Sequence, residues 1–443
     1  MKIKWLATLT LTSALVLACS DDTERPRSDG GTDDGTGQND GSGPSKTLTF
    51  LAPETLDKKN AGKHTAIATC GTKVGIAYMR YIGNVTQTCP ATLGGPPVDK
   101  PRPAHDIYYI QLDVTQWDTM TPTPVKVDQV IGEEAFGLSI AMDSSCKVYI
   151  GYLGGALSKT ECRSSDAMVA SSTDGQSFTS QTIATAGPVG DTVGHWMSVA
   201  LDSTGALHSA YRDVHFGYYE QDGNTKASLW YDTTKISDDD GSGVYASLRY
   251  NQSDQPVIMH YNATKSGVDG GLRLLYQQGG SWLAKQVVAG TTAERPRLET
   301  DGKGLFAIAY YKPSKQAMFY TESKDLETWS EVQVDTNLTR NGEFGALAFD
   351  SHGSPAVSYH LCNDYNEMSC DFTKDGVNFA YRAGTVWKVM EKIDDGGMER
   401  CGEYTALAFA PGDEPIIAYK CAEYDNQQGK SIDALRVIRG VYK

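Results

Sequence analysis

The 443-residue sequence lacks several patterns that would point to familiar kinds of site. It contains no HExxH and no CxxC motif, so the short signatures of zinc hydrolases and dithiol redox proteins are absent, and we expect no metal centre. It also lacks a basic surplus, because 40 Lys and Arg stand against 55 Asp and Glu, giving a net charge of −15. Such a protein attracts neither nucleic acid nor an anionic membrane surface, so we expect neither as a partner.

A long apolar run is missing as well. The apolar stretch at residues 5–18 follows two lysines and is too short to span a membrane, which is typical of an export signal covering residues 1–19. Val16-Leu17-Ala18-Cys19 resembles the lipobox of bacterial lipoproteins, and this resemblance implies lipid attachment at Cys19. With Ser20 next, it further implies an outer-membrane or cell-surface location. An ordinary secretory signal is the alternative.

Residues 20–46 contain almost no apolar side chain and are rich in Asp, Gly and Ser. A segment that cannot bury apolar surface stays disordered, so we expect a flexible tether here. The acidic pairs Asp21-Asp22 and Asp33-Asp34 could hold calcium weakly, but a solvated linker is the favoured interpretation. We therefore expect no cofactor.

The rest of the chain is organised by a repeat. Residues 402–419 (GEYTALAFAPGDEPIIAY) closely match residues 342–359 (GEFGALAFDSHGSPAVSY), and each reads as two alternating strands around a polar Gly/Pro turn. We take the position just before the turn as a marker. It occurs at Thr69, Asp143, Asp202, Asn251, Asp301, Asp350 and Ala410.

Successive markers lie 74, 59, 49, 50, 49 and 60 residues apart, which is the period of a four-stranded repeat with loops of variable length. Strand-only repeats of this length predict an all-β, seven-bladed β-propeller over residues 47–443, which we expect to be monomeric. The last repeat offers only three strands, so the lone strand at residues 47–52 should complete it and remove two exposed sheet edges.

A second turn of the repeat ends in an aromatic residue. These residues are Trp117, Phe178, Trp282, Trp329 and Trp387, and we expect them to pack between blades. Residues 172–178 (STDGQSF) and 323–329 (SKDLETW) resemble the Asp-box found at this turn in sialidase-like propellers. The resemblance covers two turns and implies a fold, not an activity.

Eight cysteines follow Cys19, an even number that predicts four disulfides in an exported protein. Cys401 and Cys421 flank one hairpin, so antiparallel pairing should join them, and Cys362 and Cys370 should close the loop that they share. For Cys70, Cys89, Cys146 and Cys162 two schemes remain open. Cross-blade pairs would be Cys70 with Cys146 and Cys89 with Cys162, and the alternative is sequential pairing.

The innermost strand of each blade should begin seven residues before its marker, and these starts should ring one mouth of the central channel. Three consecutive repeats place Glu there, an earlier one places His195, and the first repeat gives Gly62. The next position is aromatic in several repeats. The candidate ligand site is therefore Glu294, Glu343, Glu403, His195, Trp196, Tyr245, Phe344 and Tyr404. The alternative is that the rings pack between blades while the glutamates face water.

Two functions compete. A binding protein would present the aromatic and acidic mouth to a glycan, peptide or protein partner. A glycoside hydrolase would use two of Glu294, Glu343 and Glu403 as general acid and nucleophile or base. Residues 137–141 (GLSIA) mimic a nucleophile elbow, but Ser198 and Ser247 occupy the same repeat position as Ser139, which favours a structural role. Binding is the favoured hypothesis.

Overall fold

The computed structural model describes residues 47–89, 96–119, 121–131, 137–154, 165–186, 191–215, 226–237, 242–262, 271–289, 294–336, 340–362, 375–397, 400–425 and 429–443. The expected signal peptide, the expected lipid attachment at Cys19 and the expected tether lie outside these residues, as do Cys162, Cys370 and the side chains of Cys89 and Glu294. Residues 46–443 form one compact unit, which is the one described below. No helix in the described part of the chain combines the length and the apolar character that a membrane span requires.

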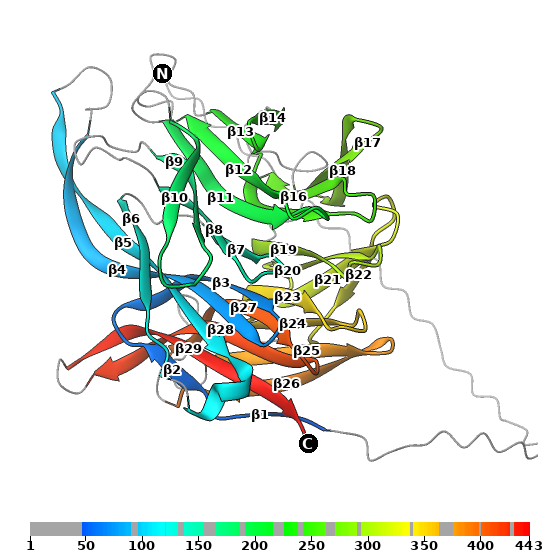
Figure 1. The fold of residues 1–443 in the computed structure, drawn as a ribbon. Helices are drawn as coiled ribbons and strands as arrows, with labels where there is room; N and C mark the ends of the chain where they lie inside the picture. The colour runs from blue at the N-terminus through cyan, green and yellow to red at the C-terminus, as the bar shows by residue number, and fades with distance from the viewer. Residues whose placement is uncertain are drawn as a thin grey trace, which may run out of the picture. The chain divides into compact units, whose positions relative to one another are not determined.

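The unit is a seven-bladed β-propeller, as the repeat predicts (Figure 1). Each blade is an antiparallel sheet, and in the first six blades the strands follow one another in chain order. The first three blades comprise β3 (Ala61–Cys70), β4 (Lys73–Cys89), β5 (Val98–Asp113) and β6 (Val125–Ile131); β7 (Leu138–Met142), β8 (Val148–Gly154), β9 (Asp166–Ser172) and β10 (Thr179–Ala184); and β11 (Asp191–Leu201), β12 (Leu207–His215), β13 (Lys226–Tyr231) and β14 (Thr234–Ser237). A short 3₁₀ helix, η1 (Val114–Thr119), joins β5 to β6.

The next three blades have the same order. They comprise β15 (Val244–Tyr250), β16 (Pro256–Asn262), β17 (Gly271–Gln278) and β18 (Ser281–Ala289); β19 (Glu294–Thr300), β20 (Phe306–Lys312), β21 (Ala317–Ser323) and β22 (Ser330–Gln333); and β23 (Arg340–Phe349), β24 (Pro355–Cys362), β25 (Gly376–Ala383) and β26 (Val386–Asp394). The last blade contains β27 (Arg400–Ala410), β28 (Glu414–Asp425) and β29 (Lys430–Tyr442).

The N-terminal strand closes the last blade. β1 (Leu48–Phe50) pairs antiparallel with β29, with Leu48 opposite Tyr442, and β2 (Glu54–Asp57) pairs with another part of the same strand. The ring is closed at the centre too, because the innermost strands β3, β7, β11, β15, β19, β23 and β27 each contact the next one, and β27 contacts β3. The prediction that residues 47–52 complete the last blade is therefore confirmed.

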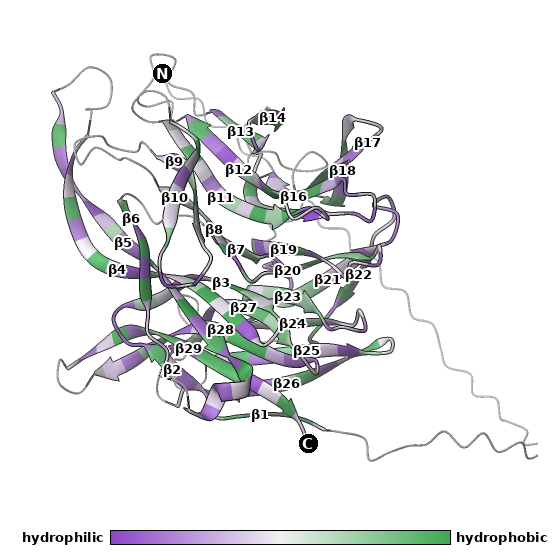
Figure 2. Cartoon of the chain, in the orientation of Figure 1, coloured by the Kyte–Doolittle hydropathy of each residue, from purple (hydrophilic) through white to green (hydrophobic). Residues whose placement is uncertain are grey.

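The core lies between blades. Seven clusters of buried hydrophobic residues are found among the described residues, and each joins two neighbouring blades, so that they follow one another around the ring. Hydrophobic residues accordingly occur in the strands of every blade (Figure 2). In six blades the second strand carries a tyrosine at an equivalent position, and these tyrosines lie fully buried in the clusters: Tyr78, Tyr152, Tyr211, Tyr310, Tyr359 and Tyr419. Their hydroxyl groups find polar partners, as Tyr359 does with Asp335 at 2.9 Å.

The marker positions have a physical explanation. In five blades the marker is Asp or Asn, and its side-chain oxygen accepts hydrogen bonds from the backbone N–H groups two and four residues later. Asp301, for example, accepts from Lys303 at 2.7 Å and from Leu305 at 2.9 Å. This local bonding shapes the turn between the first two strands of the blade.

The five aromatic residues after the second turn pack between blades, as expected. Phe178 lies against Tyr109 with ring centroids 5.3 Å apart, and Trp387 lies against Tyr320 at 5.1 Å. Trp117, Trp282 and Trp329 belong to three other clusters between blades. Their role is to fill the gap between adjacent sheets.

Two disulfides have both partners in the described residues. Cys401 is bonded to Cys421, as the hairpin predicts, and Cys70 is bonded to Cys146, which joins the first two blades. Sequential pairing of Cys70 with Cys89 is thereby excluded. Cys362 is disulfide-bonded as well, and its expected partner Cys370 lies outside the described residues.

Candidate ligand-binding site at the channel mouth

A repeated backbone distortion forms the mouth of the channel. At or next to the start of each innermost strand, one equivalent position has positive φ in all seven blades, and at six of these seven positions the residue is not glycine. In β23, for example, Glu343 pairs with His360 and the next pair is Ala346 with Ser358, so that two residues between them are left out of the ladder. Such a bulge turns a side chain in a direction that a regular strand would not give it. We call these seven residues the mouth ring: His64, Gly137, Trp196, Tyr245, Arg295, Phe344 and Tyr404.

The mouth ring encloses a cavity of about 170 Å³. All seven ring residues line it and are half-buried, whereas His195 and Glu403, which precede ring residues, are buried and do not line it. Glycines two positions before mouth-ring residues allow the backbone to follow this bulged path. Gly402 has φ +105°, and a Cβ atom there would lie only 2.5 Å from the carbonyl oxygen of Gly376.

Side chains of the ring contact one another from blade to blade. The ring of Tyr404 lies between His64 and Phe344, with centroid distances of 4.8 and 4.7 Å. The Arg295 guanidinium covers the Phe344 ring, 3.5 Å from its centroid. Trp196 and Tyr245 form a second pair, 4.3 Å apart. The result is an aromatic wall interrupted by one cation, in which a flat or apolar group can be held on several faces.

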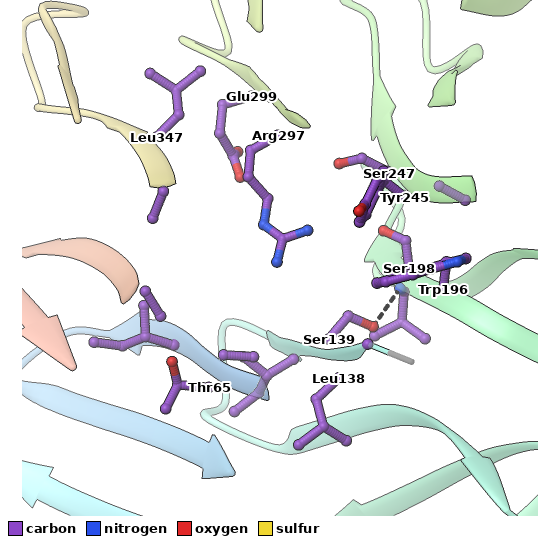
Figure 3. Close-up of a pocket in the computed structure, with 18 of the residues that line it drawn as sticks. Thr65, Leu138, Ser139, Trp196, Ser198, Tyr245, Ser247, Arg297, Glu299 and Leu347 are labelled. Carbon is purple, nitrogen blue, oxygen red and sulfur yellow. Dashed lines mark hydrogen bonds between the residues drawn. The ribbon is translucent and has the colours of Figure 1, made fainter. Parts of the chain in front are cut away.

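A second arginine, Arg297, lies two residues further along β19 than Arg295. Arg297 lines both the mouth cavity and a deeper cavity of about 110 Å³, and Figure 3 shows its guanidinium reaching into the open centre. At the six equivalent positions the other blades carry only Ala or Ser: Ala66, Ser139, Ser198, Ser247, Ala346 and Ala406. Small side chains leave the channel open at this level, so a single long cationic side chain stands in otherwise free space.

The two arginines have no salt-bridge partner among the described residues. No hydrogen bond or ion pair joins Arg295 or Arg297 to another described residue, and Nη1 of Arg295 is buried without a partner in that part of the chain. Glu299 is the one carboxylate among the described lining residues, and Arg249 occupies it through a hydrogen bond of 2.7 Å and an ion pair. Burial and the neighbouring Arg295 lower the pKa of Arg297, although a guanidinium stays protonated at neutral pH.

The serines of the channel are structural. The Ser139 hydroxyl accepts a hydrogen bond from the Val199 N–H at 2.9 Å (Figure 3). The Ser198 hydroxyl accepts one from the Leu248 N–H at 3.0 Å. Ser247 donates to the Leu298 carbonyl at 3.3 Å. Each of these bonds joins one blade to the next. The structural interpretation of Ser139 is therefore confirmed.

The structure separates the aromatic residues predicted for the mouth from the charged ones. Trp196, Tyr245, Phe344 and Tyr404 come together around the cavity. The predicted convergence of glutamates is not found there, because Glu403 is buried against Lys420, 2.7 Å away, and Arg400. Burial alone would raise the pKa of Glu403, but the charges of Lys420 and Arg400 outweigh it and hold this pKa below its ordinary value. Glu343 and His195 do not line the cavity either, and the Glu294 side chain lies outside the described set.

Three functional candidates do not belong to the predicted set: His64, Arg295 and Arg297. Counting back from the marker gives Gly62 in the first blade, whereas the ring residue is His64. In the first blade the turn between the paired Thr69 and Val74 has four residues, whereas the same turn in other blades has five. Counting back from the marker therefore misplaces the ring position of the first blade by one residue. For Arg297 the sequence holds a usable signal, namely one arginine among seven equivalent positions that are otherwise Ala or Ser.

No protein-family model and no curated protein sequence matches this chain. Similar solved structures include a protein of unknown function from Dyadobacter fermentans, with 9% identity, 81% of this chain and 98% of that chain covered, and a TM-score of 0.44. They also include the NanB sialidase of Streptococcus pneumoniae, at 12% identity, 90% and 70% coverage and 0.42. A third is the Hadza microbial sialidase Hz136, at 10% identity, 90% and 96% coverage and 0.45. Similarities this low carry no argument about activity.

Proposed function

We propose that this protein is an extracytoplasmic binding protein whose propeller mouth receives a small anionic group of its ligand. The observation that carries the proposal is the pair Arg295 and Arg297, which face one cavity without an ion-pair partner among the described residues. Desolvated cations without partners are costly. In a chain of net charge −15, positive charge concentrated in a channel lined by aromatic rings favours a role in ligand recognition over a role in stability.

The dimensions of the cavity limit what can enter. At about 170 Å³ the mouth cavity is smaller than a typical pocket for a drug-sized molecule. It suits one carboxylate with an adjoining flat or apolar group, such as the acidic end of a glycan or of a peptide. The guanidiniums would hold the carboxylate by charge-assisted hydrogen bonds, and the rings of Phe344 and Tyr404 would cover the apolar part.

Glycoside hydrolysis has less support. The usual mechanism needs two carboxyl groups on either side of the scissile bond, or a tyrosine nucleophile with a carboxylate beside it. Within the described lining of both cavities Glu299 is the only carboxylate, and its oxygens are bound to Arg249. Of the expected trio of glutamates, the two whose side chains are described, Glu343 and Glu403, do not line this cavity. A scan of chromogenic sugars, including sialosides, tests the hydrolase hypothesis directly, and turnover that depends on a mouth residue would support it.

Titration with matched small molecules tests binding. Benzoate carries a carboxylate on a flat ring, and benzamide has nearly the same shape without the charge. We expect benzoate to change the tryptophan fluorescence, since Trp196 lies in the mouth, and benzamide to have much less effect. Arg297→Met should weaken benzoate roughly 10- to 100-fold, the range for a hydrogen bond to a charged group.

Arg382→Met is the matched control for that substitution. Arg382 lies on β25 and is bonded to Glu322 at 2.7 Å, and it does not line the mouth cavity. It should leave benzoate affinity unchanged. Equal binding of benzoate and benzamide, or equal losses in the two variants, would contradict the proposed anion site. Sialic acid and glucuronic acid, compared with galactose, then extend the test to acidic sugars.

We also propose that the propeller is held at the outer membrane or cell surface by a lipid on Cys19. The support is the lipobox-like sequence ahead of an apolar-poor stretch. The lipobox resemblance implies a diacylated Cys19, and two acyl chains are enough for stable anchoring of a tethered domain. Metabolic labelling with a fatty acid should mark the wild type and not Cys19→Ala, and an unlabelled wild type would disprove the anchor.

A further inference from the structure

Arg295 and Arg297 share the mouth with a third polar side chain, His64 of β3. Its imidazole lies against the Tyr404 ring at 4.8 Å, and its Nε2 atom is buried with no hydrogen-bond partner in the described part of the chain. A buried imidazole nitrogen without a partner is costly unless something outside the resting structure satisfies it. His64 lines the cavity, so a ligand placed there is the available partner.

The groups that face His64 are nearly all cationic. Arg295 and Arg297 come from β19, His105 from β5, and Lys63 precedes His64 on its own strand. On β27, the neighbouring Tyr404 contributes its ring, while Glu403 is directed to Lys420 and Arg400. Lys420 of β28 is itself shared between Glu403 and Asp433 of β29. Arg80 of β4 is paired with Asp57, and β7 carries no charged residue.

These surroundings keep the imidazole neutral in the unliganded protein. Burial first, and then the charges of Arg295, His105, Lys63 and Arg297, lower the pKa of His64 well below its ordinary value. An anion between the arginines would offset part of this positive field and so raise the pKa of His64, because a negative charge near an imidazole favours its protonated form. The proton would come from solvent and would let Nε2 donate a hydrogen bond to the anion.

We propose that His64 is the third ligand-binding group of the mouth and takes up a proton when an anion binds beside Arg295 and Arg297. This inference rests on the proposed anion site and adds that pH regulates the affinity of that site. Because the ligand raises the pKa of His64, affinity should increase as pH falls through the bound-state pKa. Linkage allows up to about tenfold per pH unit, and the gain should be absent at higher pH, where His64 stays neutral in both states.

The test uses benzoate, whose carboxylate keeps its charge across the range from about pH 8 to about pH 5.5. Benzoate should bind more tightly as pH falls, and a pH-stat should record proton uptake at saturation. His64→Asn should remove the uptake and flatten the pH dependence while still binding benzoate through the arginines. Asn is chosen because it tolerates the positive φ of this position better than most residues.

His352→Asn is the control, because His352 lies in an exposed turn beside Asp413 and outside the channel. It should keep the proton uptake of the wild type. Benzoate binding without proton uptake in the wild type, or with equal uptake in His64→Asn, would overturn the role of His64 and leave the proposed function intact. Failure of the wild type to bind benzoate would overturn both. The wild-type measurement decides the matter even if His64→Asn does not fold.

Discussion

The two ends of the innermost strands can be compared blade by blade. At the end nearer the next strand, five blades use Asp or Asn in the same way, with one side-chain oxygen accepting two backbone N–H groups. At the mouth end all seven blades share the positive φ, yet the side chains are His, Gly, Trp, Tyr, Arg, Phe and Tyr. Repeated side chains thus form the blade, and varied side chains on a repeated backbone form the site.

This difference between framework and site would be wrong if a repeated residue could be replaced without loss of stability. Tyr359 is fully buried, and its hydroxyl donates to Asp335 at 2.9 Å. Tyr359→Ala should lower the free energy of unfolding by about 4 kcal/mol, because it removes a buried ring and leaves a buried carboxylate without its donor. Thermal and denaturant unfolding would show this. A loss below about 1 kcal/mol would mean that the repeated tyrosine is not a core residue.

Glu403 sharpens the comparison, because it stands next to the mouth ring and yet belongs to the framework. Glu403→Gln should lower stability by about 2 kcal/mol near neutral pH, since Lys420 and Arg400 lose a buried counter-charge. The pKa of Glu403 is lowered in the folded protein, so its contribution is present above the unfolded-state pKa and is lost as pH falls through the folded-state value.

The wild type and Glu403→Gln should therefore converge in thermal midpoint on acidification below about pH 4. Benzoate affinity serves as the control and should change little. A large loss of binding with unchanged stability would instead place the Glu403 carboxylate in the ligand site, as the sequence-based hypothesis had it.

Phe344 tests the other side of the comparison. Its ring lines the cavity, is half-buried and lies under the Arg295 guanidinium. Phe344→Ala should cost benzoate affinity by roughly 3- to 10-fold, which corresponds to the loss of one ring face. The free energy of unfolding should change by less than about 1 kcal/mol, unlike that of Tyr359→Ala. A loss of about 3 kcal/mol or more would assign Phe344 to the packing between blades.

The smallest expected effect comes from a marker turn. Asp301→Ala should lower stability by about 1 kcal/mol, because the N–H groups of Lys303 and Leu305 lose their acceptor. Asp301→Asn should be nearly neutral, since Asn251 makes the same two bonds in the preceding blade. Equal losses in the two variants would show that charge, not the side-chain oxygen, matters at this turn.

The number of blades could be predicted from sequence because the marker turn is made by local bonds that need Asp or Asn at a set distance from backbone N–H groups. The closing role of β1 followed from a missing strand in the last repeat. The first inference uses side chains that act the same way in five blades. Such residues recur through the sequence at the repeat period and can be recognised there, as Asp143 and Asp350 can.

The site could be predicted only in part. Predicting side-chain directions from alternation assumes that every residue of a strand pairs regularly with its neighbour strand. The bulge leaves Phe344 and Gly345 out of this pairing, so that Phe344 lines the cavity and Glu343 does not. The ring position itself does not announce this bulge, since its positive φ is held by His, Trp, Tyr, Arg and Phe alike. The absence of counter-charges at Arg295 also depends on contacts between blades, which a single repeat does not contain.

The pairing of β1 and β2 with β29 has a consequence for how the chain folds during synthesis. Thr47 and Lys443 exchange two backbone hydrogen bonds, of 2.8 and 3.0 Å, across almost the whole length of the propeller. The last blade therefore cannot be completed until β29 has left the ribosome, however early the other blades form. Contacts this distant in sequence make folding slow. A newly made chain would then spend its slowest step as an open array with two unpaired sheet edges.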